Sequence, residues 1–399
     1  MAQLASLLLM PLLSRLYSPE EFGTFAVYYA LSTVFGLIST LRFDVTIVLA
    51  KDENEAAHLV WLSLTICALM TVLTGIAMAL GAWWDLSAYL SFRLIPATLT
   101  SVLAYGIIQT LINWHSRQQS FEVLGFRNVA ERVLTLGSGI GFALIGWHEL
   151  GLVLAQTLGL GLSVLYLFSK TKLRYSDNDH STWRQLVKRY ADFPSRQLFS
   201  TLLSTGAGQL LSLLFAHFFS RADLGQYSLA TRVLEAPINL IANTFSTVYY
   251  QTVASRSLAE RQRLFLRSLK GLGLAFAGPI LLLALTGPWL FSWIFGANWV
   301  IAGMLAQVLS VLTLFRLLFI SQSSVLLIQR RLTIDLWISA FMFAAQVGGF
   351  ALGLVYFGTM QGCVLLITIL SSLVYSFSLY KIYAILNVTQ STTPMAHSL

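Results

Sequence analysis

The sequence predicts an all-α protein that crosses a membrane many times. Of its 399 residues, 56% are apolar and only 11% are charged, whereas an ordinary soluble domain is about 25% charged. The mean hydropathy is +0.72. The apolar residues fall in continuous runs of about 20, the length that an α-helix needs to cross a bilayer, and they do not alternate as in barrel strands. These observations exclude a soluble enzyme, a disordered chain and a secreted disulfide scaffold.

Twelve apolar runs predict membrane spans, because each approaches or reaches the length that crosses about 30 Å of hydrocarbon. They cover residues 2–17, 22–41, 59–80, 87–112, 129–147, 149–168, 197–219, 225–250, 268–286, 299–326, 334–356 and 361–386. The longest connection, 169–196, separates six runs from six. We therefore predict an N-terminal six-helix lobe (1–168), a cytoplasmic linker (169–196), a C-terminal six-helix lobe (197–386) and a cytoplasmic tail (387–399).

The linker contains a short helical pattern. Trp183, Leu186, Val187 and Tyr190 recur at i, i+3, i+4 and i+7, and basic residues lie among them. This pattern predicts an amphipathic helix that lies on the cytoplasmic leaflet. A solvated linker is the alternative.

The basic residues predict the orientation. Eighteen of the 25 Lys and Arg residues lie in one alternating set of connections, and the opposite set holds only Arg15 and Arg221. The positive-inside rule then places both termini in the cytoplasm. This distribution also explains the net charge of +8 without nucleic-acid binding. The opposite ends of the spans carry an aromatic belt of Trp83, Trp84, Trp147, Trp289, Trp293 and Trp299.

An internal repeat joins the two halves. The segment LYSPEEFGTF (16–25) aligns with FFSRADLGQY (218–227) at a constant offset of 202 residues. Each copy lies between the first and second spans of its half. Six intervening spans leave both halves with the same topology, so we expect a pseudo-twofold axis along the membrane normal and a central cavity between the lobes.

Polar residues inside predicted spans are candidates for function, because charges are costly in hydrocarbon. The eighth span carries a polar stripe on one helical face, spaced by three or four residues. Its members are Ser228, Arg232, Glu235, Asn239, Asn243 and Ser246. The stripe either lines a wet cavity or holds a structural Arg232–Glu235 pair at i, i+3.

Three further charges lie in or near spans. Asp44 follows Thr33, Gly36 and Thr40 at a similar spacing in the second span, and it has either a coupling or an interfacial role. Arg316 lies deep in the tenth span. Arg93 of the fourth span either lines the cavity or extends to the outer interface. The glycine pairs Gly137/Gly141 and Gly349/Gly353 indicate close helix packing.

Motifs for enzymatic or cofactor chemistry are missing. The sequence has no GxxxxGK[ST] phosphate loop, no histidine spacing typical of metal ligands and no paired carboxylates in an outer loop. Cys67 and Cys363 lie in separate apolar runs and fit small buried hydrophobes. We therefore expect no catalytic residues, no metal and no cofactor.

Several segments resemble one transporter family, the Wzx-type oligosaccharide flippases. They are PLLSRLYSPEEFGTFAVYYAL (11–31), LRFDVTIVLAKDENEAA (41–57), YADFP (190–194) and GQYSLATRVLEAPINLIANTFSTVYYQ (225–251). That family is the polysaccharide-transport branch of the multidrug/oligosaccharidyl-lipid/polysaccharide exporter superfamily. The similarity extends over nearly the whole chain.

The resemblance implies twelve to fourteen helices in two lobes. It also implies that undecaprenyl-diphosphate-linked oligosaccharide is flipped from the cytoplasmic to the periplasmic leaflet of the bacterial inner membrane, for O-antigen or other surface polysaccharide. The implied partners are the lipid bilayer, H⁺ or Na⁺, and polysaccharide polymerase and chain-length proteins.

We expect the substrate to contact Ser228, Arg232, Asn239, Asn243, Arg316 and Arg93, because guanidinium groups suit a diphosphate and amides suit sugars. Glu235 and Asp44 are the candidates for ion coupling or for counter-ions. Two alternatives stay open. A cation-coupled drug exporter would favour an acidic cavity, and a membrane-embedded polymerase would be expected to carry a large periplasmic loop.

The charge distribution predicts the topology. Reporter fusions at Asp177 and Glu260 should report the cytoplasm, and fusions at Asp85 and Asn298 should report the periplasm. A periplasmic signal at Asp177 would contradict the two-lobe arrangement.

Overall fold

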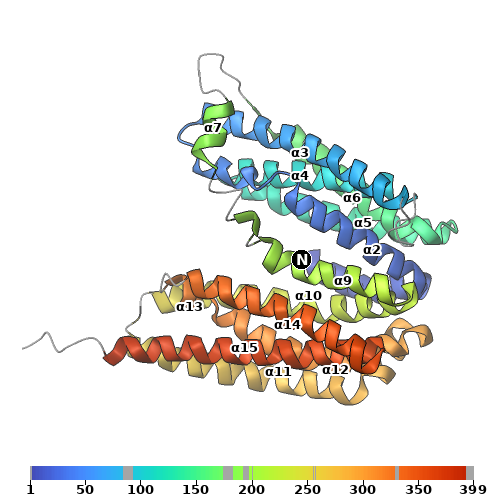
Figure 1. Ribbon diagram of the computed structural model, residues 1–399, viewed down its shortest axis with the longest axis vertical. Coiled ribbons are helices and arrows are strands. Elements are labelled where there is room, and N and C mark those ends of the chain that lie inside the picture. Colours follow the sequence, from blue (N-terminus) through green and yellow to red (C-terminus); the bar gives the residue numbers. More distant parts are fainter. Residues whose placement is uncertain are drawn as a thin grey trace, which may run out of the picture. The chain divides into compact units, whose positions relative to one another are not determined.

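The computed structural model describes residues 2–83, 93–173, 183–191, 197–199, 201–254, 256, 258–328 and 332–391. Within these ranges all regular structure is helical (Figure 1), which confirms the all-α prediction. The helices are α1 (Ala2–Leu16), α2 (Pro19–Ile38), α3 (Glu53–Trp83), α4 (Ile95–Arg117), α5 (Phe121–Leu144), α6 (His148–Lys170), α7 (Trp183–Arg189), α9 (Ala207–Phe218), α10 (Arg221–Ala254), α11 (Leu258–Phe295), α12 (Val300–Gln322), α13 (Ser324–Ile328), α14 (Leu332–Phe357) and α15 (Met360–Ser391). Three short elements are tighter or wider than an α-helix: η1 (Phe43–Leu49), η2 (Leu202–Gly206) and η3 (Ala297–Trp299).

Eight segments among the described residues are long and apolar enough to cross a membrane. They lie in α2, α3, α4, α6, α11, α12 with its flanking turns, α14 and α15. The four other predicted spans coincide with α1, α5, α9 and α10. Of these, α1 and α9 contribute only shorter apolar stretches, Leu7–Leu16 and Ala207–Phe218. The total of twelve spans therefore stays a prediction.

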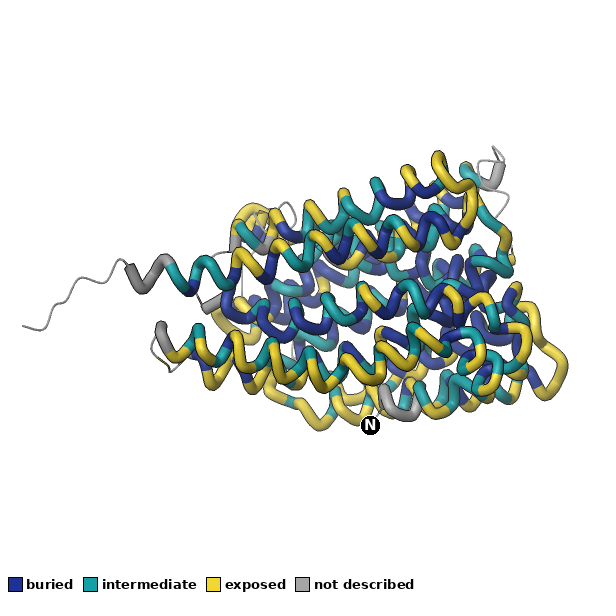
Figure 2. Tube along the Cα trace, turned by 90° about the horizontal axis from the view of Figure 1, so that it is seen from below, coloured by how far each residue is buried: buried dark blue, intermediate teal, exposed yellow. Residues whose placement is uncertain are grey.

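The long helices expose apolar side chains in a way that suits lipid. Along α3, Leu69, Val72, Leu73 and Ile76 are each between 52% and 61% exposed. Buried positions form bands along the helices, with exposed positions on other faces (Figure 2). A water-facing helix would carry polar groups at these exposed positions.

Some predicted span boundaries differ from the helices. The fourth predicted span begins at residue 87, outside the described residues, and α4 continues past residue 112 to Arg117. Asp85 and Asp177 also lie outside the described residues. The ninth predicted span, 268–286, is the middle of the much longer α11, which has 38 residues. The N-terminal turns of α11 are rich in charged residues and lie outside the predicted span, whereas its C-terminal turns up to Phe295 are apolar and aromatic and extend the helix beyond that span.

The chain divides into two compact units, Met1–Gly225 and Gln226–Leu399. The first unit contains α9, which packs against α2. By the predicted topology α9 belongs to the C-terminal lobe, whose boundary at residue 197 stays a prediction.

The sequence repeat is a repeated helix start. At α2, the Ser18 amide donates to Glu21 Oε2 (2.7 Å), and the Glu21 amide donates to Ser18 Oγ (3.3 Å). At α10, the Ser220 amide donates to Asp223 Oδ2 (3.3 Å), and the Asp223 amide donates to Ser220 Oγ (3.1 Å). Reciprocal capping of this kind satisfies amides that have no partner within the helix. The aligned residues Ser18 and Ser220, and Glu21 and Asp223, therefore cap the starts of α2 and α10 in the same way.

The repeated glycines bring the two helix starts together. A Cβ atom on Gly23 would collide with the backbone carbonyl of Arg221, and a Cβ atom on Gly225 would collide with that of Pro19. Pro19 and Arg221 are themselves 202 positions apart, so each copy of the repeat packs its glycine against the equivalent residue of the other copy. This reciprocal contact is the local symmetry that a pseudo-twofold axis requires.

The predicted linker helix is present as α7, but its buried face packs on protein. Leu186 and Tyr190 are 1% and 8% exposed. They belong to a cluster with residues of η1, α3 and α4: Phe43, Ile47, Ala50, Ala56, Ala57, Leu59, Val60, Leu62 and Trp114. The expectation that this whole apolar face lies on the membrane is wrong, because these two side chains are buried in the protein; Trp183 and Val187 remain exposed.

An ion pair fixes α7 in place. Arg189 pairs with Glu55, whose side chain is 4% exposed and also accepts a hydrogen bond from the Lys51 amide (2.7 Å). Burial raises the pKa of Tyr190, with a further contribution from Glu55, so its hydroxyl stays protonated. Residues 174–182 and 192–196 of the linker lie outside the described residues.

Of the two predicted glycine pairs, one makes close helix contacts. Cβ atoms on Gly349 and Gly353 of α14 would meet the backbone of Ile367 and Cys363 of α15. Cβ atoms on Gly137 and Gly141 would meet nothing within 4 Å. The prediction of close packing at Gly137/Gly141 is therefore wrong, because no described atom comes into contact distance of these two positions on α5.

Gly23→Ala and Gly225→Ala should each lower stability by about 1–3 kcal/mol, because the added methyl group overpacks against backbone that cannot rotate away. Thermal unfolding of the purified protein in detergent measures this effect. Gly137→Ala is the matched control, since the new Cβ atom has open space, and it should leave the midpoint unchanged or raised. Equal midpoints for all three variants would contradict the reciprocal contact.

Candidate functional site

The polar stripe of α10 lies in the second compact unit and meets a charge from α12. Glu235 of α10 forms an ion pair with Arg316 of α12. The side chains are 48% and 31% exposed, although α12 is one of the apolar candidate spans. A partly exposed ion pair on an apolar candidate span indicates contact with water rather than hydrocarbon.

Arg232 lies one turn before Glu235 on α10. Its Nε donates to Ser228 Oγ (3.1 Å), and Ser228 is buried. We considered a structural Arg232–Glu235 pair from the sequence, but the ion pair that Glu235 makes is with Arg316. The i, i+3 spacing would allow Arg232 to pair with Glu235, but the partner that Glu235 has, Arg316, is brought to it by the packing of α12.

Two amides continue the stripe beyond Pro237, which lies within α10. Asn239 is half-buried and Asn243 is exposed. Neither amide side chain bonds to another residue in the described part of the chain, so both have their donors and acceptors available. Tyr227 and Tyr375 lie within electrostatic reach of the Glu235–Arg316 pair. The surroundings of the pair therefore offer amide and phenol groups as well as charge.

Arg93 has a different environment. It precedes α4 in the first compact unit and pairs with Glu149, in the first turn of α6, at 3.2 Å. Both side chains are highly exposed, at 71% and 64%. This geometry favours the interfacial alternative for Arg93 over cavity lining.

Asp44 lies outside the second predicted span. That span was predicted to reach residue 41, but α2 ends at Ile38. Leu41 and Arg42 adopt left-handed backbone conformations (φ 47° and 64°), and η1 begins at Phe43. The left-handed conformation of these two residues interrupts the helix, so Asp44 does not lie on the polar face of α2. Sequence periodicity alone cannot detect such a break.

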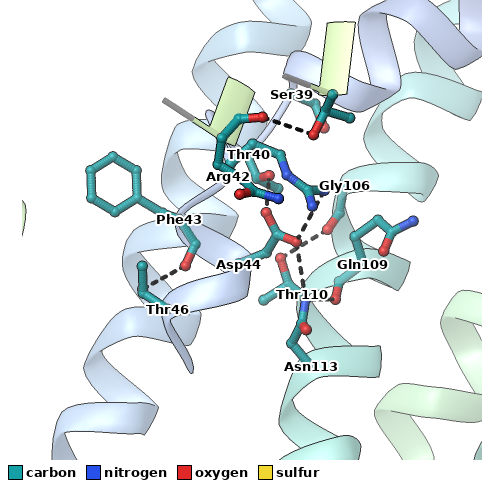
Figure 3. Close-up of polar contacts among 12 residues, drawn as sticks. Ser39, Thr40, Arg42, Phe43, Asp44, Thr46, Gly106, Gln109, Thr110 and Asn113 are labelled. Carbon is teal, nitrogen blue, oxygen red and sulfur yellow. Dashed lines mark hydrogen bonds and ion pairs between the residues drawn. The ribbon is translucent and has the colours of Figure 1, made fainter. Parts of the chain in front are cut away.

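Asp44 is nevertheless buried, with 1% exposure. Its Oδ1 accepts from Thr40 Oγ1 (2.6 Å), and its Oδ2 accepts from Asn113 Nδ2 (3.0 Å), with Arg42 Nη1 at 3.9 Å (Figure 3). This site joins η1 to α4.

Arg117 secures the far end of η1. Its Nη1 donates to the carbonyl oxygens of Ile47 (3.3 Å), Val48 (3.3 Å) and Ala50 (2.8 Å). These carbonyls come at the end of a short helix and lack helical partners. Both ends of η1 therefore depend on side chains of α4.

A third polar site was missed by the sequence analysis. Arg127 and Glu131 of α5 form a buried ion pair, with side chains 11% and 10% exposed. Ser163 of α6 donates to Glu131 Oε2 (3.2 Å). Opposite charges at i, i+4 were the available signal, but Arg127 falls just outside the predicted span 129–147.

Metal-binding clusters are not found among the described residues, where no three His, Cys, Asp or Glu side chains lie together. Cys67 and Cys363 are buried free thiols. The polar sites consist of charged pairs, amides and hydroxyls.

The chain is similar to proteins of polysaccharide biosynthesis. A family model described as "Polysaccharide biosynthesis protein" matches residues 12–303. The succinoglycan biosynthesis transport protein ExoT of Rhizobium meliloti (strain 1021) is 24% identical over 307 residues. That match covers 71% of this chain and 59% of ExoT, so the chain spans about three fifths of this curated relative.

Two solved structures share the fold. An inward-facing multidrug resistance MATE family transporter of the MOP superfamily aligns with a TM-score of 0.75 and 15% identity, covering 98% of this chain and 96% of the other. The lipid II flippase MurJ in an inward closed conformation aligns with a TM-score of 0.75 and 13% identity, covering 97% and 89%. At these identities the likeness establishes the fold alone.

Proposed function

The chain belongs to the polysaccharide biosynthesis protein family, and from that membership we propose that it is a transporter, not an enzyme, that flips lipid-linked oligosaccharide across the bacterial inner membrane. One similar protein is named for transport in succinoglycan biosynthesis, and one similar structure is a lipid II flippase. Both names support a lipid-linked sugar as the substrate class. The substrate we propose is an undecaprenyl-diphosphate-linked repeat unit for O-antigen or another surface polysaccharide, moved from the cytoplasmic to the periplasmic leaflet.

The charge of the α10–α12 site carries this proposal. Arg232 and Arg316 carry two positive charges and Glu235 carries one negative charge, so these three partly exposed side chains have a net charge of +1. A diphosphate needs cationic partners wherever it leaves the headgroup layer. A cation-coupled drug exporter would favour a net negative site, so the cluster supports an anionic substrate.

The individual groups suit the parts of this substrate. Arg232 offers the guanidinium geometry that binds phosphate oxygens in pairs. Arg316 is neutralised by Glu235 at rest, and a phosphate group competes with that carboxylate for it. The available amides of Asn239 and Asn243 suit sugar hydroxyls. Alternating access would expose these groups to each side of the membrane in turn.

Glu235 and Asp44 remain the candidates for coupling to H⁺ or Na⁺. Their surroundings differ: Glu235 is half exposed and has one cationic partner, whereas Asp44 is buried with two neutral donors and Arg42 at 3.9 Å. Protonation of Glu235 would release Arg316 for substrate, which gives a direct route for a proton to change substrate affinity. The alternative role for Glu235 is that of a permanent counter-ion.

Arg232→Lys should retain part of the flipping activity, and Arg232→Gln should lose nearly all of it at normal membrane abundance. A lysine keeps the charge but loses the paired hydrogen bonds to phosphate. Surface polysaccharide and the amount of protein in the membrane are measured together. Arg256→Gln, which removes an exposed cation paired with Glu260, is the matched control.

If Arg232 only packs α10 through Ser228, Arg232→Gln and Ser228→Ala should instead lower abundance to a similar degree. Normal flipping by Arg232→Gln at normal abundance would falsify the diphosphate assignment.

Collapse of the proton or sodium gradient should no longer affect a Glu235→Gln/Asp44→Asn double variant if these carboxylates couple transport. The single variants identify which group responds, because each removes one titratable site and keeps its shape. Flipping is followed in everted vesicles with and without an ionophore. A double variant that flips normally and still responds to the ionophore would exclude the coupling role.

A further inference from the structure

One face of α11 is exposed from end to end. Its exposed positions follow each other at steps of three or four residues, and they form one slowly winding stripe. The stripe is basic at its N-terminal end, apolar in the middle and aromatic at its C-terminal end. Its members are Arg263, Arg267, Lys270, Leu274, Gly278, Leu281, Leu285, Trp289 and Trp293.

The spacing along this stripe matches a bilayer. Lys270 and Trp289 are 19 positions apart, which is about 28 Å of helix at 1.5 Å per residue. The hydrocarbon core is about 30 Å thick. Leu274 and Leu285 between them are 80% and 71% exposed, as suits lipid contact. With Lys270 and Trp289 at the two boundaries, Arg267 and Arg263 reach about 4 to 10 Å further, into the headgroup layer.

Within the part of the chain that the structure describes, the three cations of the stripe have no protein partner. Neighbouring basic residues at this end of α11 are engaged: Arg256 pairs with Glu260, and Arg261 Nε donates to the Arg256 carbonyl (2.8 Å). Arg263, Arg267 and Lys270 make no ion pair or side-chain hydrogen bond within the described part of the chain. Three cations on successive turns, each at headgroup depth, therefore lack an anion.

We propose that Arg263, Arg267 and Lys270 form a binding surface for the phosphate groups of anionic phospholipids. Phosphate is the complementary ligand at this depth, and guanidinium binds it through paired hydrogen bonds. A bulk phospholipid fits this face as a whole, because its acyl chains would cover the exposed leucines that follow the cations, and the tryptophans suit the opposite membrane interface. By the predicted orientation this leaflet is the cytoplasmic one. The proposal does not depend on the transported substrate.

A fluorophore on the stripe can measure which lipid occupies it. Leu266→Cys places a label between Arg263 and Arg267 at a 38% exposed position, and the two native cysteines are buried. The full chain is reconstituted in phosphatidylcholine bilayers that contain nitroxide-labelled phosphatidylglycerol or nitroxide-labelled phosphatidylcholine. The ratio of the two quenching curves gives the relative binding constant at the stripe.

We expect phosphatidylglycerol to be preferred by between about tenfold and about a hundredfold, from the attraction of three interfacial cations. The ratio of the two binding constants should approach one in the triple variant Arg263→Gln/Arg267→Gln/Lys270→Gln. It should also fall in 1 M salt, where the screening length is about 3 Å. Lys51→Gln/Lys170→Gln/Lys172→Gln removes the same charge from exposed sites elsewhere and should keep it. Arg263→Lys/Arg267→Lys should keep most of it, which guards against misfolding of the triple variant.

A ratio near one in the otherwise unchanged protein would overturn the proposal. So would equal loss of preference in the two triple variants, because the effect would then reflect net charge and not the stripe. Undecaprenyl phosphate that displaces the quencher at a far lower mole fraction than phosphatidylglycerol would assign the surface to polyprenyl lipid instead.

Discussion

A charge inside a bilayer needs a partner, since an isolated charge in hydrocarbon costs several kcal/mol, and this requirement organises the polar interior of the protein. Each carboxylate described here in or beside the helices has a cation or several donors: Glu235 has Arg316, Glu131 has Arg127 and Ser163, and Asp44 has Thr40 and Asn113. The pairs differ in exposure. Arg127–Glu131 is buried and joins α5 to α6 through Ser163, whereas Glu235–Arg316 is partly exposed.

Backbone amides and carbonyls at the helix ends also have hydrogen-bond partners. Where the chain leaves α2, its carbonyls at the end of η1 are bonded by Arg117 of α4, and the left-handed residues Leu41 and Arg42 turn the chain toward that support. Reciprocal caps satisfy the first amides of α2 and α10. The duplicated segment is therefore retained at both places for a physical reason: each copy begins a helix, and its glycine permits close approach to the other copy.

Individual residues show how far sequence reasoning extends. The polar stripe of α10 and the helix at 183–189 were predicted correctly as local structure, because spacing along one helix depends only on its own residues. Glu235 shows the limit: Arg232 was its nearest charge along the sequence, but Arg316 is 81 positions away and became its partner. Asp44 shows a second limit. The spacing of polar residues in the sequence continues past residue 38, but the helix α2 ends there. Arg127 was assigned to a connection, because hydropathy could not distinguish a paired, buried arginine from a solvated one.

The sequence by itself determined the fold class, the approximate position of the spans, the repeated segment and the set of polar residues from which a site can be built. Composition and periodicity are local properties, and the bilayer admits few folds for long apolar runs. Only the tertiary structure decided which charges pair, that Leu186 and Tyr190 pack on η1 and α3 instead of lipid, and that Asp44 bonds to α4. Those outcomes depend on which helices approach each other, and packing between segments far apart in the chain leaves no signal in the spacing along either one.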